Sequence, residues 1–218
     1  LATPKEPTVG TLIVTEFVTL DGIAQAPGGP DEDPDSNFAF GGWQAPLIEA
    51  GTGDVIFERA KGMDALLLGR RTYDIFSNYW PNAPEEIPFT GLLNSVPKYV
   101  ASHTLSEPSW ATTTVLDGDL TVAVNELTDR HDTVHVIGSL NLVQSLLDAR
   151  LVDQLELWIY PIVLGTGKRV FEHGTAPTAF NVVEATTFPG GTTNLVLTYD
   201  GVPSTGDMTV DEPHLRPS

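Results

Sequence analysis

Short apolar runs alternate with segments of helical apolar spacing along most of this chain, and this alternation constrains its fold more than any other feature. Strands are predicted at residues 11–18, 65–68, 98–102, 112–115, 134–137 and 155–160, and helices at 46–60, 73–80, 120–129 and 140–149. Strands that alternate with helices favour a largely parallel sheet with helical crossovers. The fold class predicted is therefore α/β.

The later part of the chain predicts an antiparallel hairpin. Residues 180–187 and 192–199 are strand-like and flank Pro189-Gly190-Gly191, whose turn chemistry favours a tight reversal. We expect one domain over residues 11–201. A loose arm over residues 1–10 and a tail over residues 202–218 complete the organisation, because both contain prolines and lack periodicity.

Composition excludes several classes of site and partner. With 29 acidic and 11 basic residues, the net charge is −18, so neither nucleic acid nor an anionic membrane is an expected partner. The chain has no cysteine, which excludes disulfides and thiolate metal sites, and its 5 histidines lack metal-ligand spacing. No apolar run approaches the roughly 20 residues of a membrane span. A cytoplasmic protein without a metal is expected.

The most informative motif is Gly69-Arg70-Arg71-Thr72, which follows the apolar run 65–68. Its position predicts two guanidinium groups and a hydroxyl at a helix N-terminus, directly after a buried strand. Free backbone N–H groups and the helix dipole favour an anion there, and arginine matches phosphate oxygens two at a time. We interpret Arg70 and Arg71 as phosphate ligands.

A second junction of the same kind is Val136-Ile137-Gly138-Ser139. A glycine at the carboxyl end of a strand lets a ligand approach the backbone closely. Two such junctions can hold the two ends of one phosphate-bearing molecule, for which a dinucleotide is the natural candidate. A plain turn at Gly138 remains the alternative, since glycine often follows a strand.

Four motifs follow one another along residues 11–199: Thr19-Leu20-Asp21-Gly22, Leu67–Tyr73, Val136–Ser139 and the segment 151–171. In this order they resemble the dihydrofolate reductase-like superfamily, and within it the C-terminal reductase domain of bifunctional riboflavin-biosynthesis enzymes. The resemblance implies a twisted, mostly parallel eight-stranded sheet flanked by helices, with a C-terminal antiparallel hairpin. It also implies NADPH as hydride donor.

The resemblance further implies which residues bind the cofactor. They are Gly69, Arg70, Arg71 and Thr72 at the phosphate-binding turn, Ser102 and His103 at the adenosine end, Gly138, Ser139, Leu140, Asn141 and Leu142 at the pyrophosphate, and Thr19 and Ile23 at the nicotinamide. Relatives usually have glycine at the position of Leu140, which weakens the case for close backbone contact there.

Substrate contacts are expected from Asp21, Trp43 and Tyr73. The two aromatic side chains can flank a flat ring, and packing at the rim of the core is their alternative role. For Asp21 the alternative is a turn with Gly22. Dihydrofolate reductases use a helical carboxylate as proton donor. The acidic residues available here, Glu49, Asp54 and Glu58, lack the family's pattern, so no catalytic residue is assigned.

The predicted function is an NADPH-dependent reductase that transfers a hydride to a small heteroaromatic or conjugated substrate, such as a pterin or a flavin precursor. The alternative is a non-catalytic module that binds NADPH or another ligand, which the unassigned proton donor favours. A weaker third option is a chain that kept the fold and lost the cofactor. A homodimer is a possible assembly, to which the apolar strand 155–160 could contribute, although a central strand of the sheet would have the same composition.

Overall fold

The structure is a computed structural model that describes residues 10–207. The expected arm therefore lies outside the described residues except for Gly10, and so does most of the expected tail. Residues 202–207 form neither helix nor strand. The ordered elements begin at Thr11 and end at Tyr199, close to the expected domain limits.

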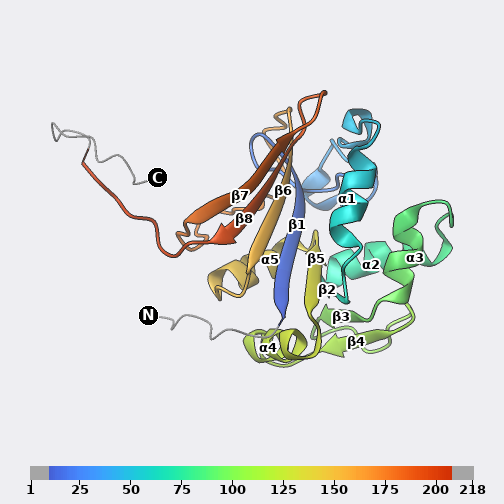
Figure 1. Cartoon of the computed structure of the whole chain (residues 1–218). Coiled ribbons are helices and arrows are strands. Elements are labelled where there is room, and N and C mark those ends of the chain that lie inside the picture. The colour runs from blue at the N-terminus through green and yellow to red at the C-terminus, as the bar shows by residue number, and fades with distance from the viewer. Residues whose placement is uncertain (1–9, 208–218) are drawn as a thin grey trace.

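A single eight-stranded sheet forms the centre of the molecule (Figure 1), in the order β4-β3-β2-β5-β1-β6-β8-β7. The strands are β1 (Thr11–Thr19), β2 (Ala65–Gly69), β3 (Lys98–Ala101), β4 (Thr113–Leu116), β5 (Thr133–Ile137), β6 (Gln154–Tyr160), β7 (Phe180–Thr187) and β8 (Thr193–Tyr199). The strands β1 to β6 pair in parallel, and β8 pairs antiparallel with both β6 and β7. The predicted fold class, including the C-terminal hairpin, is confirmed.

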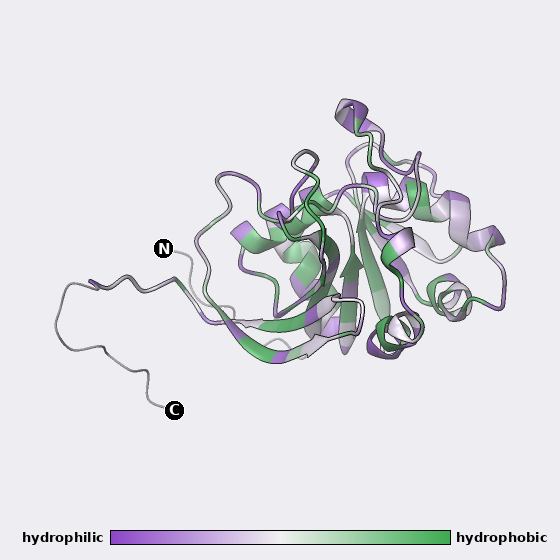
Figure 2. Ribbon diagram, turned by 90° about the horizontal axis from the view of Figure 1, so that it is seen from above, coloured by the Kyte–Doolittle hydropathy of each residue, from purple (hydrophilic) through white to green (hydrophobic). Residues whose placement is uncertain are grey.

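Helices cover both faces of this sheet. They are α1 (Thr52–Ala60), α2 (Arg70–Tyr79), α3 (Pro88–Ser95), α4 (Leu120–Arg130) and α5 (Leu140–Asp148). Buried residues of α4 and α5 pack against one face, and buried residues of α1, α2 and α3 against the other. Figure 2 shows the apolar residues running along the central strands between these layers.

The helix α3 was not predicted from the sequence. Its first residue, Pro88, ends the proline-rich stretch 81–88, whose composition is typical of a loop, and Gly91 lowers its helix propensity. Proline is nevertheless well tolerated in the first turn of a helix, where its missing N–H has no partner to lose. Tertiary burial decides the conformation, since Leu93 is 1% exposed in the core under α2.

β1 is the central strand and extends beyond its neighbour β5. The last pair between them is Thr15 with Ile137, whereas β1 pairs with β6 as far as Thr19. Alternate residues of β1 face opposite sides, because successive side chains of a strand alternate. Val14 and Val18 pack in the cluster that includes α5, and Phe17 packs in the cluster beside α1.

The position of β6 bears on the expected homodimer. β6 lies between β1 and β8, so its backbone is fully engaged inside the sheet. The edge strands are β4 and β7, and β7 exposes Val182 and Val183. The homodimer stays a prediction, and strand 155–160 has no free edge with which to pair with a second copy. Within residues 10–207, no helix is long and apolar enough to cross a membrane.

The C-terminal segment should be dispensable for folding if the chain is cut after Gly201. Gly201 accepts a backbone hydrogen bond from Ala179 at 2.9 Å, so it belongs to the domain. We expect deletion of residues 202–218 to leave the melting temperature within a few degrees. Thermal unfolding followed by circular dichroism measures this, and a loss of about ten degrees, or about 3–5 kcal/mol for a domain of this size, would contradict it.

Candidate active site

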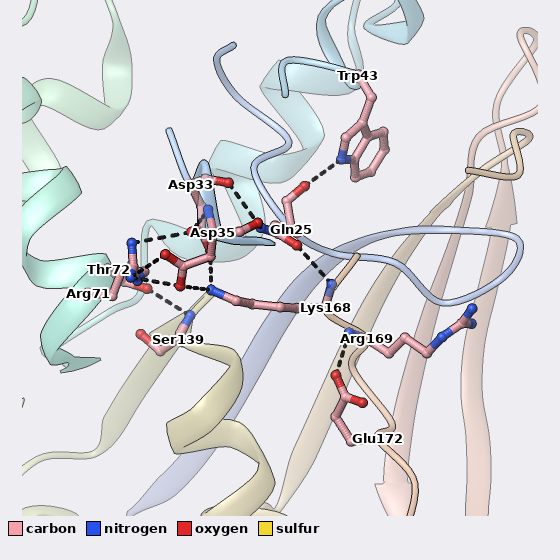
Figure 3. A network of polar contacts seen from close by, with 10 residues as sticks. All are labelled: Gln25, Asp33, Asp35, Trp43, Arg71, Thr72, Ser139, Lys168, Arg169 and Glu172. Atoms are coloured by element: carbon pink, nitrogen blue, oxygen red, sulfur yellow. Dashed lines mark hydrogen bonds and ion pairs between the residues drawn. The ribbon is translucent and has the colours of Figure 1, made fainter. Parts of the chain in front are cut away.

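Two strand-to-helix junctions, β2 to α2 and β5 to α5, are joined by hydrogen bonds between them. The Gly69 N–H donates to Ser139 Oγ at 3.0 Å. In return, the Ser139 N–H donates to Thr72 Oγ1 at 3.0 Å, the contact drawn in Figure 3. Gly138 and Ser139 both have left-handed backbones, with φ of 62° and 66°. The linkage places the N-termini of α2 and α5 together at the carboxyl edge of the sheet.

Both junctions open onto one cavity of about 1580 Å³. All the predicted cofactor residues except Thr19 and Ile23 line it: Gly69, Arg70, Arg71, Thr72, Ser102, His103, Gly138, Ser139, Leu140, Asn141 and Leu142. They come from the ends of three neighbouring strands, β3, β2 and β5. The structure therefore brings together segments that the sequence analysis selected separately.

Thr19, Asp21 and Ile23 instead form a hydrogen-bonded turn outside the cavity lining, in which Thr19 and Ile23 are buried and Asp21 is partly exposed. Thr19 Oγ1 donates to Asp21 Oδ1 at 2.6 Å and accepts from the Ile23 N–H at 3.0 Å. The Asp21 carboxylate also accepts from the backbone N–H groups of Leu164 and Gly165, at 3.2 and 2.8 Å. These contacts agree with the turn alternative for Asp21, whereas the expected nicotinamide contacts of Thr19 and Ile23 stay predictions.

Trp43 and Tyr73 also lie outside the cavity lining, which corrects their expected substrate contacts. Tyr73 is 2% exposed, and its hydroxyl accepts from the Trp110 backbone N–H at 3.1 Å. Trp43 packs edge-on against Tyr160, and its Nε1–H donates to the Gln25 carbonyl at 2.9 Å. Their long-range partners hold both rings in the core.

Six other aromatic side chains line the end of the cavity between α1 and α2: Phe17, Phe57, Phe76, Trp80, Phe89 and Trp158. Three polar residues accompany them, namely Thr15, Glu156 and Arg59. Burial raises the pKa of the Glu156 carboxyl, and the nearby Arg59 guanidinium opposes this shift. Flat apolar walls with a few polar groups are typical of a site for a small aromatic ligand.

None of this aromatic end was predicted from the sequence. The signal available for Glu156 is a glutamate inside the otherwise apolar strand 154–160. Of the carboxylates that we considered as proton donors, Asp54 lines the cavity. Glu49 accepts from the Gly190 N–H and Glu58 pairs with Lys61 on the surface, so neither reaches it.

The two arginines of the Gly69–Thr72 motif point to different partners. Arg70 Nε donates to both carboxylate oxygens of Asp74 at 2.9 Å, and its Nη1 lies 3.4 Å from Thr104 Oγ1, directly after β3. Arg71 instead faces Asp33 at 3.3 Å and Asp35 at 2.7 Å, in the loop 27–42. Arg70 is thus the arginine beside the expected adenosine end.

Lys168 completes the ion-pair cluster around Arg71 (Figure 3). Its Nζ lies 2.6 Å from Asp33 and 2.8 Å from Asp35, and the Lys168 ammonium holds the pKa of the Asp35 carboxyl below its usual range. Gln25 adds hydrogen bonds to the Asp33 and Asp35 carbonyls, at 3.0 and 3.1 Å. The cluster fixes the loop 27–42 against the rim of the cavity.

Glu16 is the functional candidate that the sequence analysis missed. It lies in β1, lines the cavity and is 2% exposed. Within residues 10–207, its Oε1 atom has no hydrogen-bond partner, and burial raises the pKa of the carboxyl to about 8. The signal in the sequence was a single acidic residue within an apolar strand, which we read only as strand.

The comparison with protein families agrees with this architecture. The family model of the RibD C-terminal domain matches residues 10–193. The chain belongs to the RibD C-terminal domain family. The dihydrofolate reductase-like resemblance of the four motifs is thereby confirmed, and membership in the family supports a reductase-like function.

Individual relatives match the RibD C-terminal domain of this protein over nearly their full length. The uncharacterized protein YyaP of Bacillus subtilis strain 168 is 26% identical over 198 residues, covering 87% of this chain and 95% of its own. A protein from Shewanella sp. PV-4, provisionally assigned to riboflavin biosynthesis, is 20% identical with a TM-score of 0.62, over 87% of this chain and 99% of its own. A pyrimidine reductase-like protein from Corynebacterium diphtheriae is 14% identical with a TM-score of 0.62. The match covers 88% of this chain and 93% of that protein. These structural likenesses establish the fold.

Among residues 10–207, no group of three or more histidine, aspartate or glutamate side chains could hold a metal ion. The polar groups that do converge on the cavity are those of the two junctions, the ion-pair cluster and the two buried glutamates.

The buried Glu16 carboxyl should make stability depend on pH. The folded protein keeps its proton up to about pH 8, whereas the unfolded chain releases it near pH 4.5. Ionisation of Glu16 in the unfolded chain therefore lowers the free energy of unfolding of the wild type progressively as pH rises from about 4.5 to about 8. Because glutamine cannot ionise, the free energy of unfolding of Glu16→Gln relative to wild type should increase between about pH 5 and 8.

Urea denaturation of both proteins at several pH values measures this difference, with an upper slope of about 1.4 kcal/mol per pH unit. Taking the difference removes contributions common to both, such as that of His135, whose pKa is lowered to about 4 by burial. Parallel stability curves across the whole range would show that Glu16 is ionised in the folded protein.

Proposed function

We propose that this protein is an NADPH-dependent reductase that transfers a hydride to a small heteroaromatic or conjugated substrate. The observation that carries the proposal is the pair of linked junctions on a cavity with an aromatic end. One end of the cavity suits phosphates, the other suits a flat ring, and a dinucleotide reductase needs both.

The residues present fit the cofactor that the family resemblance implies. The first backbone N–H groups of a helix have no partner within the helix, so the N-termini of α2 and α5 offer donors to phosphate oxygens. Arg70 would contact the 2′-phosphate beside Ser102 and His103, and residues 138–142 would hold the pyrophosphate. The unpartnered Glu16 oxygen between these residues and the aromatic end marks a polar group for a ligand to satisfy.

Bound NADPH supplies the hydride, so the protein's part is to bind, orient and exclude water. The aromatic side chains at the α1 end would hold the substrate ring in a fixed plane. Thr15, Glu156 and Arg59 would recognise polar atoms on its edge; the buried Arg59 Nε, without a partner among the described residues, is a free donor there. A small heteroaromatic ring with both donors and acceptors fits this set.

A non-catalytic module on the same fold is the second candidate function. The observation that favours it is the engagement of Glu49 and Glu58 away from the cavity, which leaves Asp54 as the cavity-lining carboxylate among those considered near α1. Monitoring NADPH oxidation across a panel of pterins, flavin precursors and quinones separates the two. Binding of NADPH by calorimetry without oxidation on any panel member would favour the module.

The preference for NADPH over NADH should depend on Arg70 more than on Arg71. A charge-assisted contact is worth about 1.5–3 kcal/mol, so Arg70→Ala should weaken NADPH binding by about 10- to 100-fold and leave NADH within about three-fold. Arg71 is already engaged by Asp33 and Asp35, so Arg71→Ala should discriminate less between the nucleotides.

Calorimetric titration of both nucleotides into each variant measures these changes. Arg130→Ala is the matched control, because Arg130 pairs with Glu126 on the exposed face of α4, away from the cavity. Equal affinities of the wild type for NADPH and NADH would refute the cofactor assignment. Gly138 is a less suitable test site, because its φ of 62° makes any side chain there strain the backbone.

A further inference from the structure

We propose that Glu16 is the residue that binds the carboxamide group of the nicotinamide ring, through a pair of hydrogen bonds. The inference rests on the proposed function, because it assumes that a nicotinamide cofactor occupies the cavity. It adds a positioning residue on the central strand that none of the predicted site residues includes.

The position of Glu16 in the sheet is the first argument. Thr15 makes the last pair with β5, and the Gly138 N–H donates to the Thr15 carbonyl at 3.3 Å. Glu16 is therefore the first residue of β1 beyond the end of β5. At this point the chain of β5 turns away through Gly138 and Ser139 into α5, and β1 loses its neighbour on that side.

The cavity passes through the opening that this creates. It is lined by Glu16, on the α5 face of β1, and also by Thr15 and Phe17, on the α1 face. The pyrophosphate end at residues 138–142 lies on the first side, and the aromatic end lies on the second. A ligand that reaches from one end to the other would therefore lie beside β1 where Glu16 lines the cavity.

Glu16 and the aromatic end, where the substrate would bind, lie on opposite faces of the sheet. Phe17, Trp158 and Glu156 belong to the α1 face, because they alternate with residues of the α5 cluster on β1 and β6. Glu16 is paired in register with Leu157, a member of that α5 cluster. A ring held between the two sides would present its carboxamide edge to Glu16 and its reactive face to the aromatic end.

The chemistry of a protonated carboxyl matches a primary carboxamide. It offers one O–H donor and one carbonyl acceptor side by side, while the carboxamide offers one N–H donor and one carbonyl acceptor in the same arrangement. Burial keeps the Glu16 proton in place at neutral pH. An ionised carboxylate would only accept, so it would leave the carboxamide oxygen without its donor.

The unpartnered state of Glu16 in the protein alone is the second argument. Leaving a buried polar atom without a hydrogen bond is destabilising, and an apolar side chain of similar size would avoid this penalty. If Glu16 serves the ligand, Glu16→Leu should fold at least as stably as the wild type. A purely structural role predicts the opposite, a lower melting temperature.

Binding measurements with a whole and a truncated ligand test the proposal. NADPH and 2′,5′-ADP, which lacks the nicotinamide, are titrated by calorimetry into wild type, Glu16→Leu and Glu16→Gln. We expect Glu16→Leu to weaken NADPH binding by about 10- to 100-fold and to change 2′,5′-ADP binding by less than about two-fold. Glutamine keeps one donor and one acceptor, so Glu16→Gln should bind NADPH within about three-fold of the wild type.

A nicotinamide analogue sharpens the test. The acetylpyridine analogue of NADPH carries a methyl ketone, which keeps the acceptor and lacks the N–H donors. The wild type should bind it more weakly than NADPH, and Glu16→Leu should bind the two with equal affinity. Glu58→Leu, a change of the same type at a surface residue paired with Lys61, is the control and should leave all affinities unchanged.

The outcomes separate this inference from the proposed function. If the wild type binds neither NADPH nor 2′,5′-ADP, the cofactor assignment fails and Glu16 with it. If it binds both, but Glu16→Leu weakens neither or weakens both equally, the cofactor assignment stands and the role of Glu16 is refuted. A folded Glu16→Leu protein of lower melting temperature and unchanged NADPH affinity would assign Glu16 to the core alone.

Discussion

The reciprocal hydrogen bonds between the two strand-to-helix junctions are the interaction on which the rest of the site depends. Gly69 donates to the Ser139 side chain and Ser139 donates to the Thr72 side chain, so each junction positions the other. Ser139 adopts a left-handed backbone for this purpose, which is unfavourable for a residue with a Cβ. The benefit is that two helix N-termini face one cavity, and each provides backbone donors for an anion.

This arrangement explains how a chain with a net charge of −18 can recognise an anionic ligand. The long-range field of the protein opposes the ligand, so recognition has to be local. Arg71 and Lys168 contribute little to it, because Asp33 and Asp35 already balance their charges and turn them into anchors for the loop 27–42. Attraction falls to the backbone donors of α2 and α5, and to Arg70, which contacts Asp74 through its Nε atom and directs Nη1 towards Thr104 beside the expected adenosine end.

The sequence predicted the parts of the site that are local in the chain. Each junction consists of a few consecutive residues, so the sequence alone could identify residues 69–72 and 138–142 as ligand-binding candidates before their contact was known. The aromatic end could not be, because Phe17, Trp158 and Phe89 meet only through the register of β1 and β6 and the packing of α3, which was itself missed. Tyr73 and Asp21 failed for the related reason that core partners distant in sequence, Trp110 and Leu164, decide where they point.

Two buried glutamates on neighbouring strands show how the sheet separates two tasks. Glu156 has polar partners on the α1 face, where Gln154 donates a hydrogen bond to it at 2.8 Å and Arg59 lies nearby. Its carboxyl is therefore hydrogen-bonded within the protein. Among residues 10–207, Glu16 Oε1 has no such partner on the α5 face, and folding stability alone would favour an apolar residue there. A carboxyl in that position becomes favourable only when a hydrogen-bonding group arrives from outside the chain. The end of β5 at Ile137 leaves the opening through which such a group can arrive.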